Sequence, residues 1–161
     1  MNFTPFRKHK GFTLIELLVV IAIIAMLAIV VFVALNPSKR LSDARDARRT
    51  ADVETILTAI HEYIVDNKGA LPTGLTTSMA ETQLGSSATA CGIVQANCNS
   101  VATACVDLTT PLAKYLKSIP VDPTASFSAA KTGYTVTVDA NNIITVKACG
   151  TEGSNSISQS R

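Results

Sequence analysis

A single carboxylate interrupts an otherwise apolar stretch near the start of this chain. Within residues 12–35 only Thr13 and Glu16 are clearly polar, and as a helix this stretch would span about 36 Å. That length exceeds the roughly 30 Å hydrocarbon core of a bilayer. A charged side chain at the centre of such a helix costs roughly 2.5–3.5 kcal/mol on insertion scales, so an ionisable group there indicates a function. We therefore expect Glu16 to have a partner.

The residues before this stretch form a short basic leader. Arg7, Lys8 and Lys10 precede Gly11, and the apolar residues begin directly after that glycine. In a secretory signal the small residue follows the apolar region, whereas here it precedes it. Cleavage after Gly11 would leave the apolar helix on the mature chain, with a new amine at Phe12. We expect the amine of one subunit to pair with the Glu16 carboxylate of its neighbour, since both groups are desolvated among apolar helices.

The run Lys10-Gly11-Phe12-Thr13-Leu14-Ile15-Glu16-Leu17 resembles the cleavage and methylation signal of type IV prepilins and of the related pseudopilins of type II secretion. The resemblance is strong through Leu35 and looser along the helix that follows. It implies that a prepilin peptidase/methyltransferase cuts between Gly11 and Phe12 and N-methylates Phe12. It also implies that Glu16 guides subunit docking, and that the chain is the structural subunit of a type IV pilus-like helical filament.

The resemblance further implies partners and a location. The partners are other copies of the chain, related minor pilins, an inner-membrane assembly platform and, before assembly, membrane lipid. The expected precursor is a single-pass protein of the cytoplasmic membrane with its head outside the cytoplasm, which assembles into an extracellular or periplasm-spanning filament. Basic residues flank the apolar stretch on both sides, so the positive-inside rule alone leaves the orientation ambiguous. The resemblance places the leader inside.

Two alternatives remain within this interpretation. One is the major pseudopilin of a type II secretion system. The other is a minor or tip pilin that binds DNA or surfaces, for which the candidate residues are Lys114, Lys117, Lys131, Lys147, Tyr115 and Tyr134. Removing the cations of the leader lowers Lys+Arg from 14 to 11 against 12 acids, so bulk charge does not indicate a nucleic-acid binder. No nucleophile–base spacing is recognisable, and we therefore expect no enzyme.

The composition divides the chain into a leader (1–11), an apolar helix (12–35) and a head (36–161). Pro37 is expected to kink the helix, because proline removes a backbone donor. A second helix over 38–67 carries an apolar stripe at helical spacing, which we expect to contact a sheet: Val53, Ile56, Leu57, Ile60, Tyr63 and Ile64. Its first turns carry charges that either pair between subunits or form a solvated surface: Asp43, Arg45, Asp46, Arg48, Arg49 and Asp52.

The rest of the head is predicted from turn and strand signals. We expect a long disulfide-stapled loop over 70–108, with at most a short helix near 79–84, and a short helix over 111–117. Two β-rich runs predict a hairpin over 134–148, and a polar, flexible tail follows over 150–161. The result is an α+β, pilin-like fold in which a long N-terminal helix contacts a small antiparallel sheet.

Four cysteines, Cys91, Cys98, Cys105 and Cys149, predict two disulfides in a head outside the cytoplasm. Four cysteines allow three connectivities, and we favour Cys91–Cys98 with Cys105–Cys149. A zinc site is the competing interpretation, but the paired C-x₂-C spacing of such sites is missing.

The segment 115–123 is similar to a Leu-Pro-x-Asp-Pro segment of major pseudopilins, some of which bind calcium in the loop that follows. Here the loop 124–131 holds no acid and the chain has no tryptophan, so calcium is left only to Asp122 and backbone carbonyls. We expect no cofactor and no metal, and a turn role for Asp122.

Overall fold

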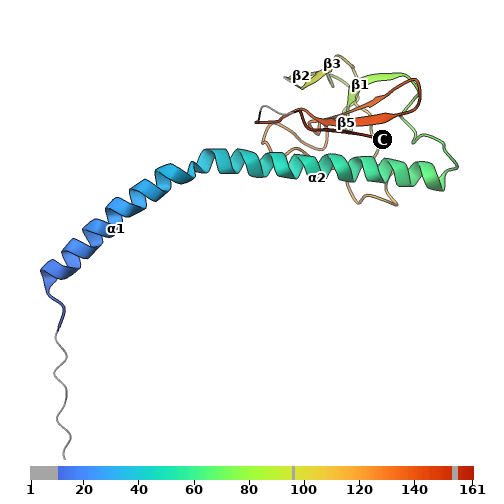
Figure 1. Cartoon of the computed structure of the whole chain (residues 1–161). Helices are drawn as coiled ribbons and strands as arrows, with labels where there is room; N and C mark the ends of the chain where they lie inside the picture. Colours follow the sequence, from blue (N-terminus) through green and yellow to red (C-terminus); the bar gives the residue numbers. More distant parts are fainter. Residues whose placement is uncertain (1–10, 96, 154–155) are drawn as a thin grey trace, which may run out of the picture. The chain divides into compact units, whose positions relative to one another are not determined.

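The computed structural model of the protein describes residues 11–95, 97–153 and 156–161. These residues form two helices followed by six strands (Figure 1), with the bounds α1 (Leu14–Leu35), α2 (Pro37–Asp66), β1 (Met79–Gln83), β2 (Ile93–Gln95), β3 (Cys98–Ser100), β4 (Tyr134–Val138), β5 (Ile144–Ala148) and β6 (Ser158–Ser160). The chain divides into two compact units, Met1–Arg40 and Leu41–Arg161. The expected leader lies outside the described residues, except for Gly11.

The first unit is dominated by α1, which ends where the expected kink was placed. Asn36 has a left-handed backbone conformation, with φ of 40°, and so breaks the helical hydrogen bonding between α1 and α2. Pro37 then begins α2, a position that suits proline because its missing N–H would have no partner there. The side chain of Asn36 caps the new helix by accepting from the backbone N–H of Lys39 at 3.5 Å.

In the second unit, α2 contacts the sheet through the predicted apolar stripe. Val53, Ile56, Leu57 and Ile60 are buried, and they belong to one core cluster with the sheet residues Tyr134, Val136, Ile144 and Val146. Tyr63 and Ile64 are partly buried against the same cluster. The apolar face of α2 is therefore used within the chain, and an α+β arrangement of a long N-terminal helix with a small antiparallel sheet is confirmed.

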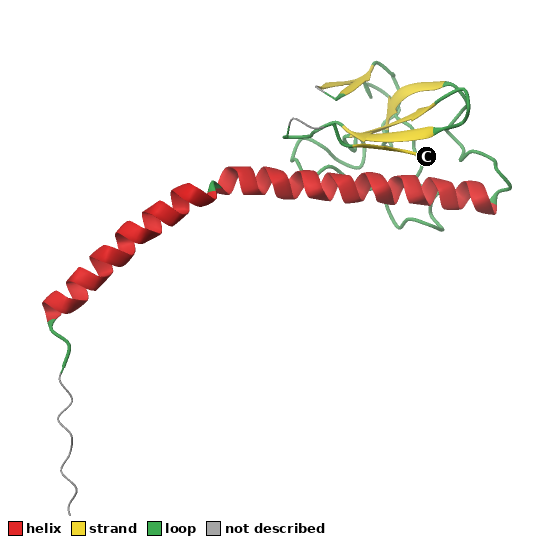
Figure 2. Ribbon diagram, viewed as in Figure 1, coloured by secondary structure: helices red, strands yellow, loops and turns green. Residues whose placement is uncertain are grey.

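The main sheet has four strands in the order β1-β4-β5-β6, and all its pairings are antiparallel (Figure 2). Strands β4 and β5 form a hairpin in which Val136 lies opposite Val146. Asp139 closes its turn, because its carboxylate accepts from the backbone N–H groups of Asn141 and Ile143, each at 2.7 Å. The side chains of β5 alternate between buried and half-buried, as expected for a strand with one face on the core.

The segment predicted as a loop over 70–108 contains three strands. The residues 79–84 do not form a helix, since β1 takes Met79–Gln83 into the main sheet beside β4. Strands β2 and β3 form a separate two-stranded sheet, in which Ile93 pairs with Ser100. The sequence gives little indication of these strands, because they are only three to five residues long and rich in polar residues. Pairing with the distant β4 makes β1 a strand, whereas β2 and β3 pair with each other over a short turn; in neither case does local propensity predict the strand.

Two further expectations are wrong. The segment 111–117 forms a series of turns instead of a helix: α-type bonds such as Leu116 N–H to Leu112 C=O alternate with shorter three-residue turns. The segment 150–161 was predicted as a flexible tail, but β6 pairs with β5 near its end, and Gly153 donates to Asp46 at 2.8 Å. Residues 154–155 lie outside the described residues.

Candidate functional site

The N-terminal end of α1 is held by a reciprocal hydrogen-bonded cap between Thr13 and Glu16. The Thr13 hydroxyl accepts from the backbone N–H of Glu16 at 3.2 Å. In return, Oε2 of Glu16 accepts from the backbone N–H of Thr13 at 2.9 Å and from its hydroxyl at 2.8 Å. This is the capping-box arrangement, in which two otherwise unpaired N–H groups of the first turn are satisfied. The predicted docking residue thus begins the helix as well.

The Glu16 carboxylate keeps an unused oxygen in this arrangement. Both of its hydrogen bonds go to Oε2, and no donor among residues 11–95, 97–153 and 156–161 reaches Oε1. Glu16 also lines a shallow apolar hollow of about 340 Å³ together with Phe12, Ile15, Val19 and Val20. A cation from outside the chain would find an exposed carboxylate oxygen beside apolar side chains.

The surface of α1 is apolar and carries no internal packing. None of its 22 residues is buried, and large apolar side chains such as Leu14 and Val33 are 81% and 73% exposed. The helix is long and apolar enough to cross a membrane, as judged by its length and composition. Soluble monomers rarely expose contiguous apolar patches larger than a few hundred Å², so this helix requires an apolar environment outside its own chain.

A second polar cluster, which the sequence analysis did not identify, joins α2 to a turn far along the chain. Arg49 is fully buried, and its Nε and Nη2 donate to the two carboxylate oxygens of Asp122 at 2.7 and 2.9 Å. Nη1 donates to Asp46 at 2.7 Å, and Nη2 also donates to the hydroxyl of Thr124 at 2.8 Å. Nearby, Arg45 forms two hydrogen bonds with Glu152, one of them at 2.6 Å.

Electrostatics reinforce this cluster. Burial alone raises the pKa of the Asp122 carboxyl, but the hydrogen bonds from Arg49 and Thr124 hold it below its usual value. The same two effects act on the pKa of Asp46, where burial is outweighed by donors that include Arg49. The hydrogen bonds to Asp122 raise the pKa of Arg49. All three groups are therefore charged at neutral pH, and the buried charge of Arg49 is compensated on two sides.

This geometry corrects the expected surface of charges on α2. Arg49 and Asp46 were predicted to pair between subunits or to face solvent, yet they pair within the chain. Asp52 accepts from the buried hydroxyl of Tyr134 at 2.7 Å. A positional signal for Arg49 existed, because it lies one helical turn before Val53 on the buried stripe. Nothing in the local sequence points to Asp122 as its partner, 73 residues away.

Asp122 is also the residue to which the calcium alternative was attached. Its two oxygens face the Arg49 guanidinium, and Oδ1 additionally accepts from the backbone N–H and the hydroxyl of Thr124. The Arg49 guanidinium therefore occupies the position that a calcium ion bound to Asp122 would need. Within the described ranges, no group of three or more His, Cys, Asp or Glu side chains is placed to hold a metal ion.

The four cysteines form two disulfides, but the favoured pairing was wrong. The bonds are Cys91–Cys105 and Cys98–Cys149. The β2–β3 register explains this pairing. Because Ile93 lies opposite Ser100, Cys91 lies beyond the hairpin and faces the chain that leads to Cys105. Cys98 instead lies in a small buried cluster with Ile93 and Cys149, so its bond fixes the hairpin to the end of β5.

The proposed basic and aromatic surface patch does not form as a whole. Tyr134 is fully buried, so it cannot take part in an exposed patch. Lys114 is paired with Asp66 at 2.6 Å, and Lys147 lies 3.6 Å from Glu81. These contacts use two of the four lysines within the chain.

The geometry defines a class of protein: an exposed apolar helix with a capped acidic first turn, followed by a small disulfide-linked α+β head. A family model described as "Prokaryotic N-terminal methylation motif" matches residues 6–32. The chain therefore carries the signal of type IV pilins and pseudopilins, as predicted from its first residues. Neither the comparison with curated proteins nor the comparison with solved structures found a match.

The methylation motif covers the predicted processing and docking residues, Gly11, Phe12 and Glu16. It supports a pilin-type precursor, implies processing by a prepilin peptidase, and favours a structural role over a catalytic one. The long apolar helix that follows fits membrane anchoring before assembly.

Proposed function

We propose that this chain is the structural subunit of a type IV pilus-like helical filament. Cleavage between Gly11 and Phe12 releases the leader, and the Phe12 amine is N-methylated. The mature chain remains in the cytoplasmic membrane through α1, with its head outside the cytoplasm, until an inner-membrane platform adds it to the filament. Other copies and minor pilins are its partners there.

One observation carries this proposal: α1 is an apolar helix of 22 residues, none of which is buried by its own chain. Burying a Val, Leu, Ile or Phe side chain is worth about 1.5–3 kcal/mol relative to water. In the membrane, lipid covers these side chains, whereas in a filament the same surface is covered by the α1 helices of neighbours. The apolar surface of α1 is therefore shielded from water both before and after assembly.

Glu16 sets the register in this proposal. Its Oε2 stays in the cap with Thr13, while Oε1 accepts from the Phe12 amine of a neighbouring copy. A charge-assisted hydrogen bond in an apolar setting is shorter and stronger than a neutral one. A subunit stacked in the wrong register would leave both charges unpaired among apolar side chains, and that state is costly.

The experiment compares Glu16→Gln with wild type in a host that assembles the filament. We expect intact mass spectrometry to show both mature chains beginning at Phe12, about 14 Da heavier than the unmodified chain. The amide loses the charge that faces the amine, so the variant is processed and anchored but enters filaments poorly. Asp43→Asn is the matched control, because Asp43 is an exposed acid outside α1. Normal assembly of Glu16→Gln would refute the role of Glu16, and a mature protein that still begins at Met1 would refute the proposed function.

The pseudopilin of a secretion system is a second form of the same function, since it uses the same processing and helix packing. The tip-pilin alternative, with DNA or a surface as ligand, has less support because Tyr134 is buried and two of the lysines are paired.

A further inference from the structure

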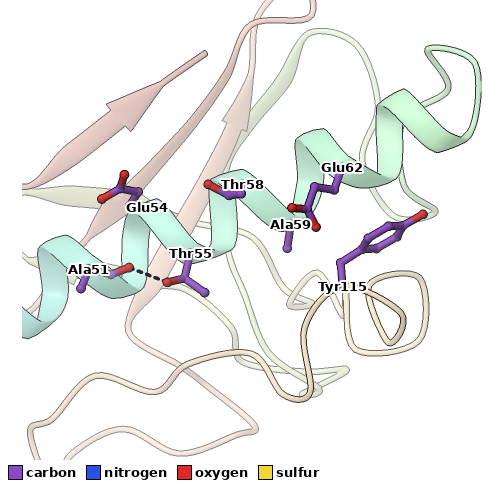
Figure 3. A pocket seen from close by; sticks show the side chains of 7 residues that line it. All are labelled: Ala51, Glu54, Thr55, Thr58, Ala59, Glu62 and Tyr115. Carbon is purple, nitrogen blue, oxygen red and sulfur yellow. Dashed lines mark hydrogen bonds between the residues drawn. The ribbon is translucent and has the colours of Figure 1, made fainter.

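A groove of about 320 Å³ lies along α2 between Ala51 and Glu62, beside the apolar stripe that contacts the core (Figure 3). Most of its lining comes from exposed residues of α2, and the ring of Tyr115 lines it from a separate segment of the chain. The residues that matter here are two acids, three small side chains on the same helix and one aromatic ring: Glu54, Glu62, Ala51, Thr55, Thr58 and Tyr115.

The two acids of the groove have no partners among the described residues, 11–95, 97–153 and 156–161. Neither Glu54 nor Glu62 forms a hydrogen bond or an ion pair there, unlike the neighbouring Asp52 and Asp66. The aromatic wall is fixed, because the Tyr115 hydroxyl donates to Asp66 at 2.8 Å and its ring meets Tyr63 edge to face at 6.2 Å. The groove therefore presents two uncompensated carboxylates beside a held aromatic ring.

The same helix carries cations with the matching spacing. Arg40 and Arg48 are eight residues apart, as are Glu54 and Glu62, so each pair spans about 12 Å along a helix. Both arginines are exposed, and the side chain of Arg48 is 62% exposed even though it lies 3.7 Å from Asp52. From each arginine to the corresponding glutamate the offset is fourteen residues. That is nearly four whole turns, or about 21 Å along the axis. An arginine therefore cannot reach its corresponding glutamate within the same helix.

We propose that the groove binds the α2 helix of a second copy of this chain, parallel to it and displaced by about 21 Å along its axis. In this register the neighbouring copy's Arg40 faces Glu54 and its Arg48 faces Glu62. The parallel direction rests on the proposed filament, in which all copies point the same way. The interface gives α2 a second contact surface, separate from the apolar surface of α1.

Side-chain size and chemistry support this occupant. Ala51, Thr55 and Thr58 are small, so a second helix can approach at the short end of the usual interaxial range of about 8–10 Å. The guanidinium that reaches Glu62 also lies near the Tyr115 face, and arginine stacks on aromatic rings. Complementary charges at two positions fix both the direction and the register of the partner, because a shift by four residues either way places Arg40 beside a threonine, Thr50 or Thr58, and so loses at least one of the two pairs.

Zero-length cross-linking tests this register in native membranes. Arg48→Lys keeps the charge and supplies an amine, and a carbodiimide then joins it to any carboxylate in contact. Cross-linked dimers are separated from single chains and mapped by mass spectrometry. We expect the dimer to join position 48 of one copy to Glu62 of another. A dimer joining position 48 to Glu54 would contradict the proposed register and overturn the proposal, and so would the absence of a dimer.

Charge exchange gives an independent readout. Arg48→Glu and Glu62→Arg are each expected to lower the association constant of the dimer about tenfold at low salt, equivalent to about 1.4 kcal/mol, and the double variant Arg48→Glu/Glu62→Arg restores it. Lys117→Glu is the matched control, as an exposed charge outside the groove. Recovery by Arg48→Glu/Glu54→Arg instead would overturn the register.

These outcomes are separate from those that test the filament. If filaments form but dimers neither cross-link through position 48 nor respond to charge reversal, this inference fails and the proposed function stands. If dimers form in the membrane with the 48–62 link and no filament is made, the proposed function fails while the groove retains its partner.

Discussion

Replacing the buried Arg49 by methionine tests the central claim about the head. Methionine keeps the length of the aliphatic part of the side chain but removes the charge and all donors. Asp122, fully buried, then loses the two bonds at 2.7 and 2.9 Å that compensate its carboxylate. Removing one partner of a buried ion pair costs about 3–5 kcal/mol. Since small domains are stable by only about 5–15 kcal/mol, Arg49→Met should remove a large share of the stability.

Equilibrium urea unfolding of the full chain in detergent micelles measures this cost. The three tyrosines, Tyr63, Tyr115 and Tyr134, all lie in the head, so near-UV circular dichroism reports the unfolding of the head rather than that of α1. Arg45→Met is the matched control, one turn earlier on the same helix. Its pair with Glu152 is partly exposed, at 38% and 27% of the two side chains, so we expect a loss of at most about 1 kcal/mol.

Two further variants separate charge from geometry. Arg49→Lys keeps the charge but not the bidentate contact with Asp122, so its free energy of unfolding should lie between those of wild type and Arg49→Met. The double variant Arg49→Met/Asp122→Asn removes the uncompensated carboxylate and should recover part of the loss. If Arg49→Met stays within about 1 kcal/mol of wild type, or if Arg45→Met is equally damaging, the buried pair is not the main connection between α2 and the 122–124 turn.

Three more predictions concern the head. Because the folded-state pKa of Asp122 lies below its unfolded value of about 3.9, its stabilisation is complete above that pH and lost as pH falls through the folded pKa, which acid titration of urea midpoints will show. Gly133→Ala should destabilise the head by more than about 1 kcal/mol, since φ is +83° and a Cβ would lie 2.9 Å from Phe127; thermal melting measures this. Peptide mapping without reduction should recover Cys98 linked to Cys149, and replacing both by serine should cost about 2–4 kcal/mol in urea unfolding.

Controls for these three follow from the same contacts. The acid dependence should weaken in Arg49→Met, because burial still raises the Asp122 pKa and only the Thr124 hydrogen bonds are left to lower it. An unchanged slope would contradict the assignment. Gly69→Ala is the comparison for Gly133, since φ there is also positive, at +91°, yet a Cβ at Gly69 would meet no other atom within 4 Å. Recovery of a peptide with Cys91 joined to Cys98 would show that the disulfide assignment is wrong.

Local patterns predicted the parts of the fold that local physics determines. The β4–β5 hairpin follows from two β-branched runs around Asp139, whose side chain closes the turn two to four residues away. By contrast, β1 and β6 carry little hydrophobic signal of their own, and β1 pairs with a strand more than fifty residues away. They form strands because the free edges of the β4–β5 hairpin provide hydrogen-bond partners, and local propensity cannot predict such pairing.

The sequence by itself determined the pilin-type signal, the apolar helix, the position of Glu16 and the stripe by which α2 meets the sheet. These features depend on residue type and on spacings within a few turns of one helix. Only the tertiary structure decided which cysteines pair, that Arg49 is buried against Asp122, and that Glu54 and Glu62 share a groove with Tyr115. Each of these contacts joins segments that are far apart in the sequence. Burial of apolar side chains brings the segments together without regard to their distance along the chain, and strand register then decides which side chains meet.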